Sequence, residues 1–319
     1  MHYTPKHTTQ FTAEPHKATL RQLEWGTMSP LDERELLDWC AGIKHVALDM
    51  DGTIYMGTTL FPYTREFLDT LTRLGISYSF LTNNPTKSHN DYLKKLEALG
   101  IEATAEQMYT SSLATIDYIK QHYPQAKRLF ALGTPSMQEE LSKAGFELCD
   151  DDPSQRPDVL VVAFDTTLVY SRLCRAAWWA SQPDIPYIAT NPDWVCPTDQ
   201  ETILVDCGSL CKSIEGATGR QPDVVIGKPN PNMLYCIRDK RGLTSREIAM
   251  VGDRIYTDVA TAQNAGSLGV LVLSGETTLD TALHNNPVPP LTALTVEELG
   301  ELLLKARDCG TKQERKLRK

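Results

Sequence analysis

The sequence lacks any long apolar run. No segment approaches the ~20 consecutive apolar residues that a membrane helix requires. The first residues, from Met1 to His7, are not followed by an apolar stretch of signal-peptide length. We therefore expect a protein of the cytoplasm with no membrane partner.

An excess of basic residues is also absent. The 319 residues include 32 Lys and Arg against 41 Asp and Glu, a formal net charge of −9. Binding a nucleic-acid backbone requires a concentrated basic face, so this charge argues against a nucleic-acid partner. The composition fits small-molecule or protein partners better.

Closely spaced cysteine pairs are scarce. The nearest two of the eight cysteines are Cys207 and Cys211, and no second pair follows at a spacing that would complete a zinc site. We interpret the cysteines as reduced thiols of a cytoplasmic protein.

Three short apolar segments each end at polar residues. His45–Leu48 is followed by Asp49, Tyr78–Leu81 by Thr82, and Glu247–Val251 by Gly252 and Asp253. Helical patterns over 63–74 and 87–99, closed by glycines, separate the first segments. This alternation predicts an α/β fold with a doubly wound, Rossmann-like parallel sheet. Ligands bind beyond the carboxyl ends of such strands, so the three polar ends should share one crevice.

Further apolar segments predict a second α/β unit. They cover 128–132, 159–164 and 187–190, between the Thr82 strand and the sequence Ile226-Gly227-Lys228-Pro229. We expect a catalytic core over 29–107 and 223–305, with an inserted domain over 108–222. Residues 1–28 are expected to form a flexible leader, and residues 306–319 a basic tail exposed to solvent.

Two acidic residues separated by one position mark the first polar strand end. On an extended strand end, Asp49 and Asp51 point to the same side, where the two anions repel unless a cation lies between them. Mg²⁺ prefers oxygen ligands and often binds carboxylates together with a substrate phosphate. Asp253, from another strand end, would complete a magnesium site. Taken alone, the Asp-x-Asp-Gly segment is equally compatible with a solvated acidic turn.

Two other strand ends supply groups that suit a phosphoryl group. Thr82, Asn83 and Asn84 offer hydroxyl, amide and backbone donors for phosphate oxygens, and we predict that they bind substrate. Lys228 offers a compact positive charge that can offset Asp49 and the phosphate together. The alternatives are an Asn-Pro turn and a solvated Gly-Lys-Pro turn. In the segment from Gly252 to Asp258, Asp258 suits a supporting or helix-start position.

These four segments, in this order, resemble the haloacid dehalogenase-like superfamily. The matching residues are Asp49 to Thr53, Thr82, Lys228, and Gly252 to Asp258. The resemblance implies that Asp49 attacks phosphorus to give an aspartyl-phosphate. It also implies that Asp51 protonates the leaving group, then activates water, and meets the metal through its backbone carbonyl.

The spacing of the segments indicates which group of the superfamily the chain resembles. Asp49 and Thr82 are 82 − 49 = 33 positions apart, whereas Thr82 and Lys228 are 228 − 82 = 146 apart, which requires an inserted cap domain after the second segment. Members with a large cap at this place form the class IIA, NagD-like or p-nitrophenyl-phosphatase-like group. The segments Asp49-Met50-Asp51-Gly52-Thr53, Leu81-Thr82-Asn83-Asn84 and Gly227-Lys228-Pro229 look like the variants of that group.

Asp51 favours hydrolysis among the reactions of the superfamily. Dehalogenase relatives lack this acid, and mutase relatives carry a helical cap for which this chain has no room between the first two segments. We predict a magnesium-dependent phosphatase. A phosphotransferase remains an alternative, as does a non-enzymatic phosphoacceptor module, although receiver domains lack an equivalent of Asp51 and an inserted domain.

Substrate choice is expected to reside in the cap. Asn191 and Asp193 are the candidates for contacting the leaving group of a small phosphorylated metabolite, such as a sugar phosphate or a nucleotide monophosphate. The alternative for this segment is an Asn-Pro turn. The adjacent Trp178 and Trp179 are expected to pack in the core of the cap or at a homodimer interface.

Overall fold

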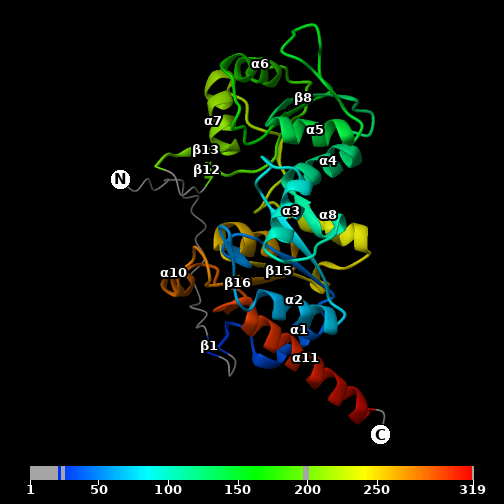
Figure 1. Cartoon of the computed structure of the whole chain (residues 1–319), viewed down its shortest axis with the longest axis vertical. Coiled ribbons are helices and arrows are strands. Elements are labelled where there is room, and N and C mark those ends of the chain that lie inside the picture. The colour runs from blue at the N-terminus through cyan, green and yellow to red at the C-terminus, as the bar shows by residue number, and fades with distance from the viewer. Residues whose placement is uncertain (1–20, 23–25, 197–200, 318–319) are drawn as a thin grey trace.

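The protein forms two α/β lobes that lie one above the other along its longest axis (Figure 1). The computed structural model describes residues 21–22, 26–196 and 201–317. The lower lobe, the core, is built on an eight-stranded sheet. In sheet order its strands are β1 (Arg21–Gln22), β2 (Met28–Ser29), β17 (Leu291–Ala293), β16 (Leu268–Val272), β15 (Ile248–Gly252), β3 (His45–Leu48), β6 (Ser77–Thr82) and β7 (Met108–Thr110). The strands from β17 to β7 are parallel.

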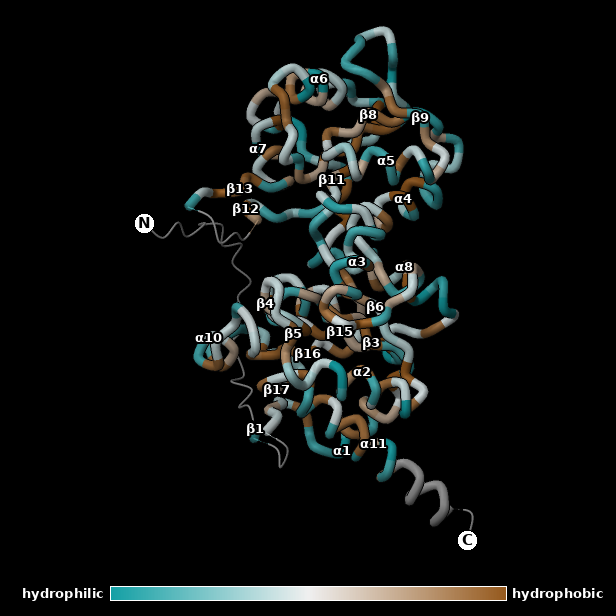
Figure 2. The backbone as a smooth tube through the Cα atoms, viewed as in Figure 1, coloured by the Kyte–Doolittle hydropathy of each residue, from teal (hydrophilic) through white to brown (hydrophobic). Residues whose placement is uncertain are grey.

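Helices cover both faces of the core sheet, because successive residues of its central strands point to opposite faces. Val46 and Leu48 of β3 face one apolar cluster, whereas Ala47 faces the other. The first cluster includes residues of α1 (Glu33–Ala41), α2 (Thr64–Arg73), α3 (His89–Ala98) and α11 (Val296–Leu317). The second includes residues of α4 (Ser111–His122), α8 (Asn232–Arg241) and α9 (Ala260–Ala265). The hydrophobic segments of the tube in Figure 2 run through the sheet. The predicted doubly wound architecture is confirmed.

Two of the predicted helices end where glycine permits a left-handed residue. Gly75 and Gly100 follow α2 and α3 with φ of 67° and 76°. A side chain disfavours this conformation, so each glycine suits the turn that closes the helix. At the other end of α3, Ser88 and Asp91 form a reciprocal capping box.

The upper lobe, the cap, is a second α/β unit. Its sheet has five parallel strands in the order β14 (Val224–Val225), β11 (Tyr187–Ala189), β10 (Val159–Val162), β8 (Arg128–Leu132) and β9 (Glu147–Leu148). The helices α5 (Pro135–Lys143), α6 (Tyr170–Ala180) and α7 (Cys207–Thr218) belong to this lobe, and α4 lies between the lobes, packed against α5 as well as α8. Strand β12 (Val195–Cys196) pairs with β13 (Leu204–Val205). Trp179 is buried in this lobe and Trp178 is exposed.

The boundaries of the inserted domain differ from those predicted. Residues 108–110 were assigned to the cap, but they form β7 at the edge of the core sheet. Residues 224 and 225 were assigned to the core, but they form β14 of the cap sheet. Strands of two or three residues are too short to show a periodicity, so neither strand could be predicted from the sequence.

The two predicted ends of the chain also need correction. Thr27 is buried and Met28 pairs with Thr292, so the last residues of the predicted leader belong to the core sheet. Residues 1–20 and 23–25 lie outside the described residues. The predicted tail is the continuation of α11, in which Ala306 is buried and Arg307 donates to the carbonyl of Ile43. Among the described residues, no helix has the length and apolar character needed to cross a membrane.

Candidate active site

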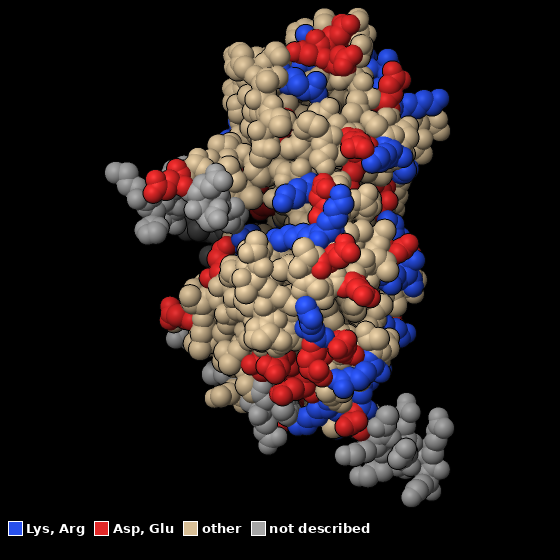
Figure 3. Space-filling view, in the orientation of Figure 1, with Lys and Arg blue, Asp and Glu red and all other residues tan. Residues whose placement is uncertain are grey.

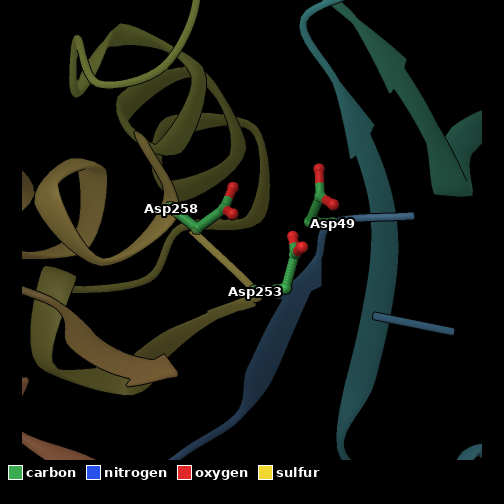
Figure 4. Close-up of side chains that lie close together, drawn as sticks. All are labelled: Asp49, Asp253 and Asp258. Carbon is green, nitrogen blue, oxygen red and sulfur yellow. The ribbon is translucent and has the colours of Figure 1, made fainter. Parts of the chain in front are cut away.

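Three carboxylates converge at the carboxyl ends of the core strands. Asp49 follows β3, Asp253 follows β15, and Asp258 lies in the π-helical turn η3 (Ile255–Val259). One oxygen from each carboxylate lies within 4.8 Å of the others, and Figure 4 shows the three side chains side by side. The backbone N–H of Asp49 donates to the carbonyl of Val251 at 2.8 Å, which extends the pairing of β3 and β15 to position 49.

A lysine from the return connection of the cap completes the cluster. Nζ of Lys228 donates to Oδ1 of Asp49 and, at 2.6 Å, to Oδ1 of Asp258. The side chain of Lys228 is 4% exposed and that of Asp258 is 0% exposed. The structure therefore brings together residues that are 179 positions apart in the chain, as the predicted convergence of strand ends required.

Burial and charge shift the pKa values of this cluster. Burial raises the pKa of Asp49 to about 7, while Lys228 opposes the shift and Asp258 adds to it. Burial alone would lower the pKa of Lys228, but Asp258 and Asp49 outweigh it and hold the pKa above its usual value. Burial likewise raises the pKa of Asp253 against the opposing effect of the Glu276 backbone N–H. The lysine is thus charged, whereas the carboxylates are crowded and short of positive charge.

The carboxylate of Asp253 has the features of a cation ligand. Its Oδ2 accepts from the backbone N–H of Glu276 at 2.6 Å, but its buried Oδ1 has no hydrogen-bond partner. Three carboxylates and one ammonium have a net charge of −2 when all are ionised. A divalent cation bound by oxygen atoms would offset this charge and satisfy the orphaned oxygen.

Two glycines let the backbone approach this carboxylate closely. A Cβ on Gly52 would lie 2.5 Å from Oδ2 of Asp253, and one on Gly275 would lie 2.1 Å from the same atom. Gly52 also has φ of +83°. Any side chain at either position would displace Asp253, so both loops depend on glycine to form the site.

Asp51 lies outside the cluster of three carboxylates and is exposed. It forms an isolated bridge with Tyr55, whose ring lies 4.0 Å below Nζ of Lys95. A metal contact from position 51 remains a prediction for the backbone carbonyl.

Thr82 and Asn84 lie at the end of β6, as predicted. Oγ1 of Thr82 accepts from the backbone N–H of Asn84 at 3.2 Å. The side-chain oxygen of Asn84 accepts from Thr86, and its Nδ2 lies 3.7 Å from Sγ of Cys196 in the cap. This strand end therefore touches the cap.

Asn83, Asn191 and Asp193, all predicted to bind substrate, bind one another at the junction of the lobes. Nδ2 of Asn83 and Nδ2 of Asn191 each donate to Oδ2 of Asp193 at 3.0 Å. Asn191 is completely buried, and it also donates to Asp206 and accepts from Thr190. Each polar side-chain atom of Asn191 has a protein partner.

The sequence reasoning missed several residues of the site. Asp258 was predicted in a supporting or helix-start position, and its carboxylate lies in the cluster, where it accepts from Lys228. Glu276, which holds Asp253 through its backbone and forms an ion pair with Arg254 at 2.8 Å, was not singled out. The adjacent Gly275 was a usable signal, since a glycine after β16 suits a close approach of backbone to a site. Asp206 carried no signal of its own.

Comparison with known proteins agrees with this geometry. The family described as haloacid dehalogenase-like hydrolase matches residues 46–147, and a second HAD-hydrolase-like family matches residues 225–302. An acid sugar phosphatase of Staphylococcus aureus is 33% identical over 247 residues, 77% of this chain and 92% of that protein.

Two solved structures share the fold of both lobes. A 4-nitrophenylphosphatase from Thermotoga maritima has a TM-score of 0.77 at 36% identity, covering 82% of this chain and 98% of its own. NagD from Escherichia coli K-12 has a TM-score of 0.72 at 30% identity, covering 80% of this chain and 98% of its own.

A carboxylate cluster with one buried lysine, at the strand ends of a doubly wound core that carries an inserted cap, defines a phosphoric monoester hydrolase. The chain belongs to the haloacid dehalogenase-like superfamily. Within it, the chain is a member of the class IIA, NagD-like group.

Proposed function

We propose that this phosphatase hydrolyses small phosphate monoesters with the help of Mg²⁺, through a phosphoenzyme formed on Asp49. The observation that carries the proposal is the position of Asp49. Its carboxylate is held by Lys228 and lies within 4.8 Å of Asp253, whose buried Oδ1 has no partner. The proposed nucleophile, the positive charge of Lys228 and a carboxylate oxygen with no hydrogen-bond partner therefore lie close together.

In the first step, a carboxylate oxygen of Asp49 attacks phosphorus and the bond between phosphorus and the leaving oxygen breaks. The exposed Asp51 donates a proton to that oxygen as it leaves. Lys228 offsets the negative charge shared by Asp49 and the phosphoryl group. Thr82 and Asn84 lie at the neighbouring strand end, where their donors suit the phosphoryl oxygens.

In the second step, Asp51 accepts a proton from a water molecule, and the oxygen of that water attacks phosphorus. The bond between phosphorus and Asp49 breaks, which releases inorganic phosphate, regenerates the carboxylate of Asp49 and leaves Asp51 protonated, ready for the next cycle. Asp51 thus acts first as an acid and then as a base.

Asp49, Asp253 and the backbone carbonyl of Asp51 are the groups that would hold Mg²⁺. The ion would supply positive charge to the phosphoryl oxygens during the transfer. Oδ1 of Asp258 is engaged by Lys228 and its Oδ2 accepts from the backbone N–H of Arg254 at 3.1 Å. We therefore assign Asp258 to positioning Lys228 and propose no metal bond for it.

The substrate class is a small metabolite, of the sugar phosphate or nucleotide monophosphate type. A relative of this chain is named an acid sugar phosphatase. On the face shown in Figure 3, Lys and Arg side chains gather at the level where the two lobes meet, which suits an anionic ester. The eight cysteines form no disulfide in the described part of the chain, and we propose action in the cytoplasm, where thiols stay reduced. The exposed Trp178 suits a homodimer through the cap, a proposal that sedimentation would test.

The test is hydrolysis of p-nitrophenyl phosphate by Asp49→Asn with Mg²⁺ present. Loss of the nucleophile should lower turnover on the order of 10⁴-fold or more. The matched control is Asp38→Asn, an exposed acid of α1 that should leave turnover unchanged. Unchanged turnover in Asp49→Asn would refute the mechanism. Phosphate appearing on an added alcohol in place of water would identify a phosphotransferase, and a screen of phosphorylated metabolites would identify the substrate.

A further inference from the structure

The side chain of Asn83 pairs with the backbone of the catalytic lysine as a neighbouring strand would. The N–H of Lys228 donates to Oδ1 of Asn83 at 2.8 Å, and Nδ2 of Asn83 donates back to the carbonyl of Lys228 at 3.0 Å. A carboxamide has the donor and the acceptor needed for such a reciprocal pair. Both backbone polar groups of Lys228 are therefore fixed by one side chain, which orients the ammonium toward Asp49.

The same amide also holds a loop of the cap. Nδ2 of Asn83 donates to Oδ2 of Asp193 at 3.0 Å. Asp193 is held in turn by Asn191, whose Nδ2 also donates to Oδ1 of Asp206 at 2.9 Å. Asp206 caps the start of α7 by accepting from the N–H of Cys207. A continuous set of hydrogen bonds therefore runs from a cap helix to the backbone of Lys228.

Asn83 lies between the two connections of the lobes. The chain leaves the core after β7, where Oγ of Ser111 donates to the backbone carbonyl of Asn83 at 2.7 Å. It returns after β14 through Gly227, where a Cβ would lie 2.7 Å from Oδ1 of Asn83. This close approach leaves no room for a side chain at position 227. Any movement of the cap about these connections displaces atoms that contact Asn83.

We propose that Asn83 is a positioning residue that couples the cap to the catalytic lysine. Because Asp193 and Lys228 share one amide group, the seating of the cap loop sets the position of the Lys228 backbone, and through it the contact of Nζ with Asp49. Both hydrogen atoms of Asn83 Nδ2 are used by these two acceptors. The inference rests on the proposed roles of Lys228 and Asp49 in hydrolysis.

This assignment differs from the prediction that Asn83 and Asp193 bind substrate. A substrate ligand would affect KM, and its effect would depend on whether the leaving group reaches it. A positioning residue would lower kcat for every substrate, including one too small to touch the cap. The two assignments therefore predict different kinetics.

The first experiment exchanges the amide of Asn83 and the carboxylate of Asp193. Asn83→Asp places a carboxylate oxygen against both the Lys228 carbonyl and Asp193, and it should lower kcat for p-nitrophenyl phosphate about 100-fold through misplacement of the lysine. In N83D/D193N, the amide at position 193 can donate to the carboxylate at position 83. The double variant should regain about tenfold in kcat over N83D, because the repulsion with the cap is removed. It should stay below wild type, since the Lys228 carbonyl still faces an oxygen.

The second experiment uses Asp193→Ala with two substrates of different size. Acetyl phosphate is too small to reach the cap, whereas p-nitrophenyl phosphate is larger. We expect kcat to fall by the same factor, about fivefold, for both substrates, since the loss of one hydrogen bond to Asn83 acts through Lys228. A thermal melt would reveal whether N83D fails to fold. In that case, the comparison of the two substrates with Asp193→Ala still tests whether Asn83 positions Lys228.

Glu140→Gln is the matched control, because Glu140 of α5 accepts from the N–H of His89 of α3 across the same two lobes but contacts neither Asn83 nor Lys228. It should leave kcat unchanged. The proposal is overturned if N83D raises only KM, if the exchange shows no recovery over N83D, or if Asp193→Ala affects p-nitrophenyl phosphate alone. An active Asp49→Asn enzyme would instead refute the hydrolytic mechanism, a result that can be told apart from each of these.

Discussion

Nζ of Lys228 lies 2.6 Å from Oδ1 of Asp258, and neither side chain is more than 4% exposed. The same ammonium donates to Asp49. Burying a charged lysine or a charged carboxylate costs free energy unless a group of opposite charge lies beside it. Asp258 thus keeps Lys228 charged and in place, while Asp49 accepts the second hydrogen bond that the ammonium of Lys228 donates.

Replacing this lysine should couple stability to metal. Lys228→Met leaves Asp49 and Asp258 buried with no cation, which should cost about 3 kcal/mol of unfolding free energy without metal. Turnover should fall about 10³-fold, because the charge that stabilises the transferring phosphoryl group is lost. Added Mg²⁺ should therefore raise the melting temperature of the variant more than that of the wild type, as followed by circular dichroism.

The matched control for this experiment is Lys240→Met. Lys240 pairs with Asp117, but its side chain is 58% exposed, so its loss should change stability by less than about 1 kcal/mol. Equal effects of Mg²⁺ on the melting temperatures of Lys228→Met and the wild type would contradict the prediction.

A single added methyl group should disturb the metal site. In Gly275→Ala the Cβ would lie 2.1 Å from Oδ2 of Asp253, so the carboxylate must move. We expect Mg²⁺ affinity to fall about 10- to 100-fold, the range typical when the support of a ligand is lost. The measurement is a Mg²⁺ titration of activity, together with calorimetry on the unreacted protein.

Gly216→Ala is the control for that substitution. Gly216 lies within α7, and a Cβ there meets no atom within 4 Å. The change should stabilise the protein by about 0.5–1 kcal/mol through helix propensity and leave Mg²⁺ affinity as it was. A similar loss of affinity in both variants would show that the close approach to Asp253 does not matter.

A buried histidine should make stability depend on pH. His45 is 0% exposed in β3, with Nδ1 2.8 Å from Oγ of Ser77 and Nε2 2.9 Å from Oγ of Ser79. Burial, with a smaller effect of Arg241, lowers its pKa to about 3. Between the unfolded pKa of about 6.5 and this value, the unfolded chain binds a proton that the folded protein does not, so stability falls as the pH falls.

The size of that effect can be measured by comparison with His45→Gln. From about pH 6 to pH 4.5 the wild type should lose about 1.4 kcal/mol per pH unit more than the variant. Urea unfolding at a series of pH values gives both slopes. Parallel slopes would mean that His45 is not held neutral in the folded protein.

The sequence was informative where strands are buried and parallel. The segment His45–Leu48 and the segment that ends at Asp253 each read as a buried strand with a polar end, and parallel strands bring such ends to one edge of a sheet. The structure accordingly brings Asp49, Asp253 and Lys228 together. This part of the site was predictable because buried parallel strands can be recognised locally, and their carboxyl ends necessarily lie at one edge of the sheet.

The sequence was uninformative where contacts join distant short segments. The two-residue strands β2 and β14 carry no periodicity, so the leader and the end of the cap were misplaced. Asn83 and Asp193 are 110 positions apart and belong to different lobes, and each is an ordinary turn residue in its own segment. Their hydrogen bond depends on how the lobes pack, which no local pattern encodes.

Replacing the exposed acid at position 51 should separate the two halves of the reaction. Asp51→Asn can neither donate nor accept the proton, but p-nitrophenolate leaves readily without protonation, so the first step should suffer less than the attack of water. Phosphoenzyme on Asp49 should therefore accumulate, while turnover falls about 10²- to 10⁴-fold. Acid quenching followed by mass spectrometry of the peptide that contains Asp49 would detect it. Asp280→Asn, an acid of α10 (Leu279–His284) with an 87% exposed side chain, is the control and should retain full turnover. If Asp51→Asn hydrolyses p-nitrophenyl phosphate at the wild-type rate, or loses turnover without any bound phosphate, Asp51 does not activate the water.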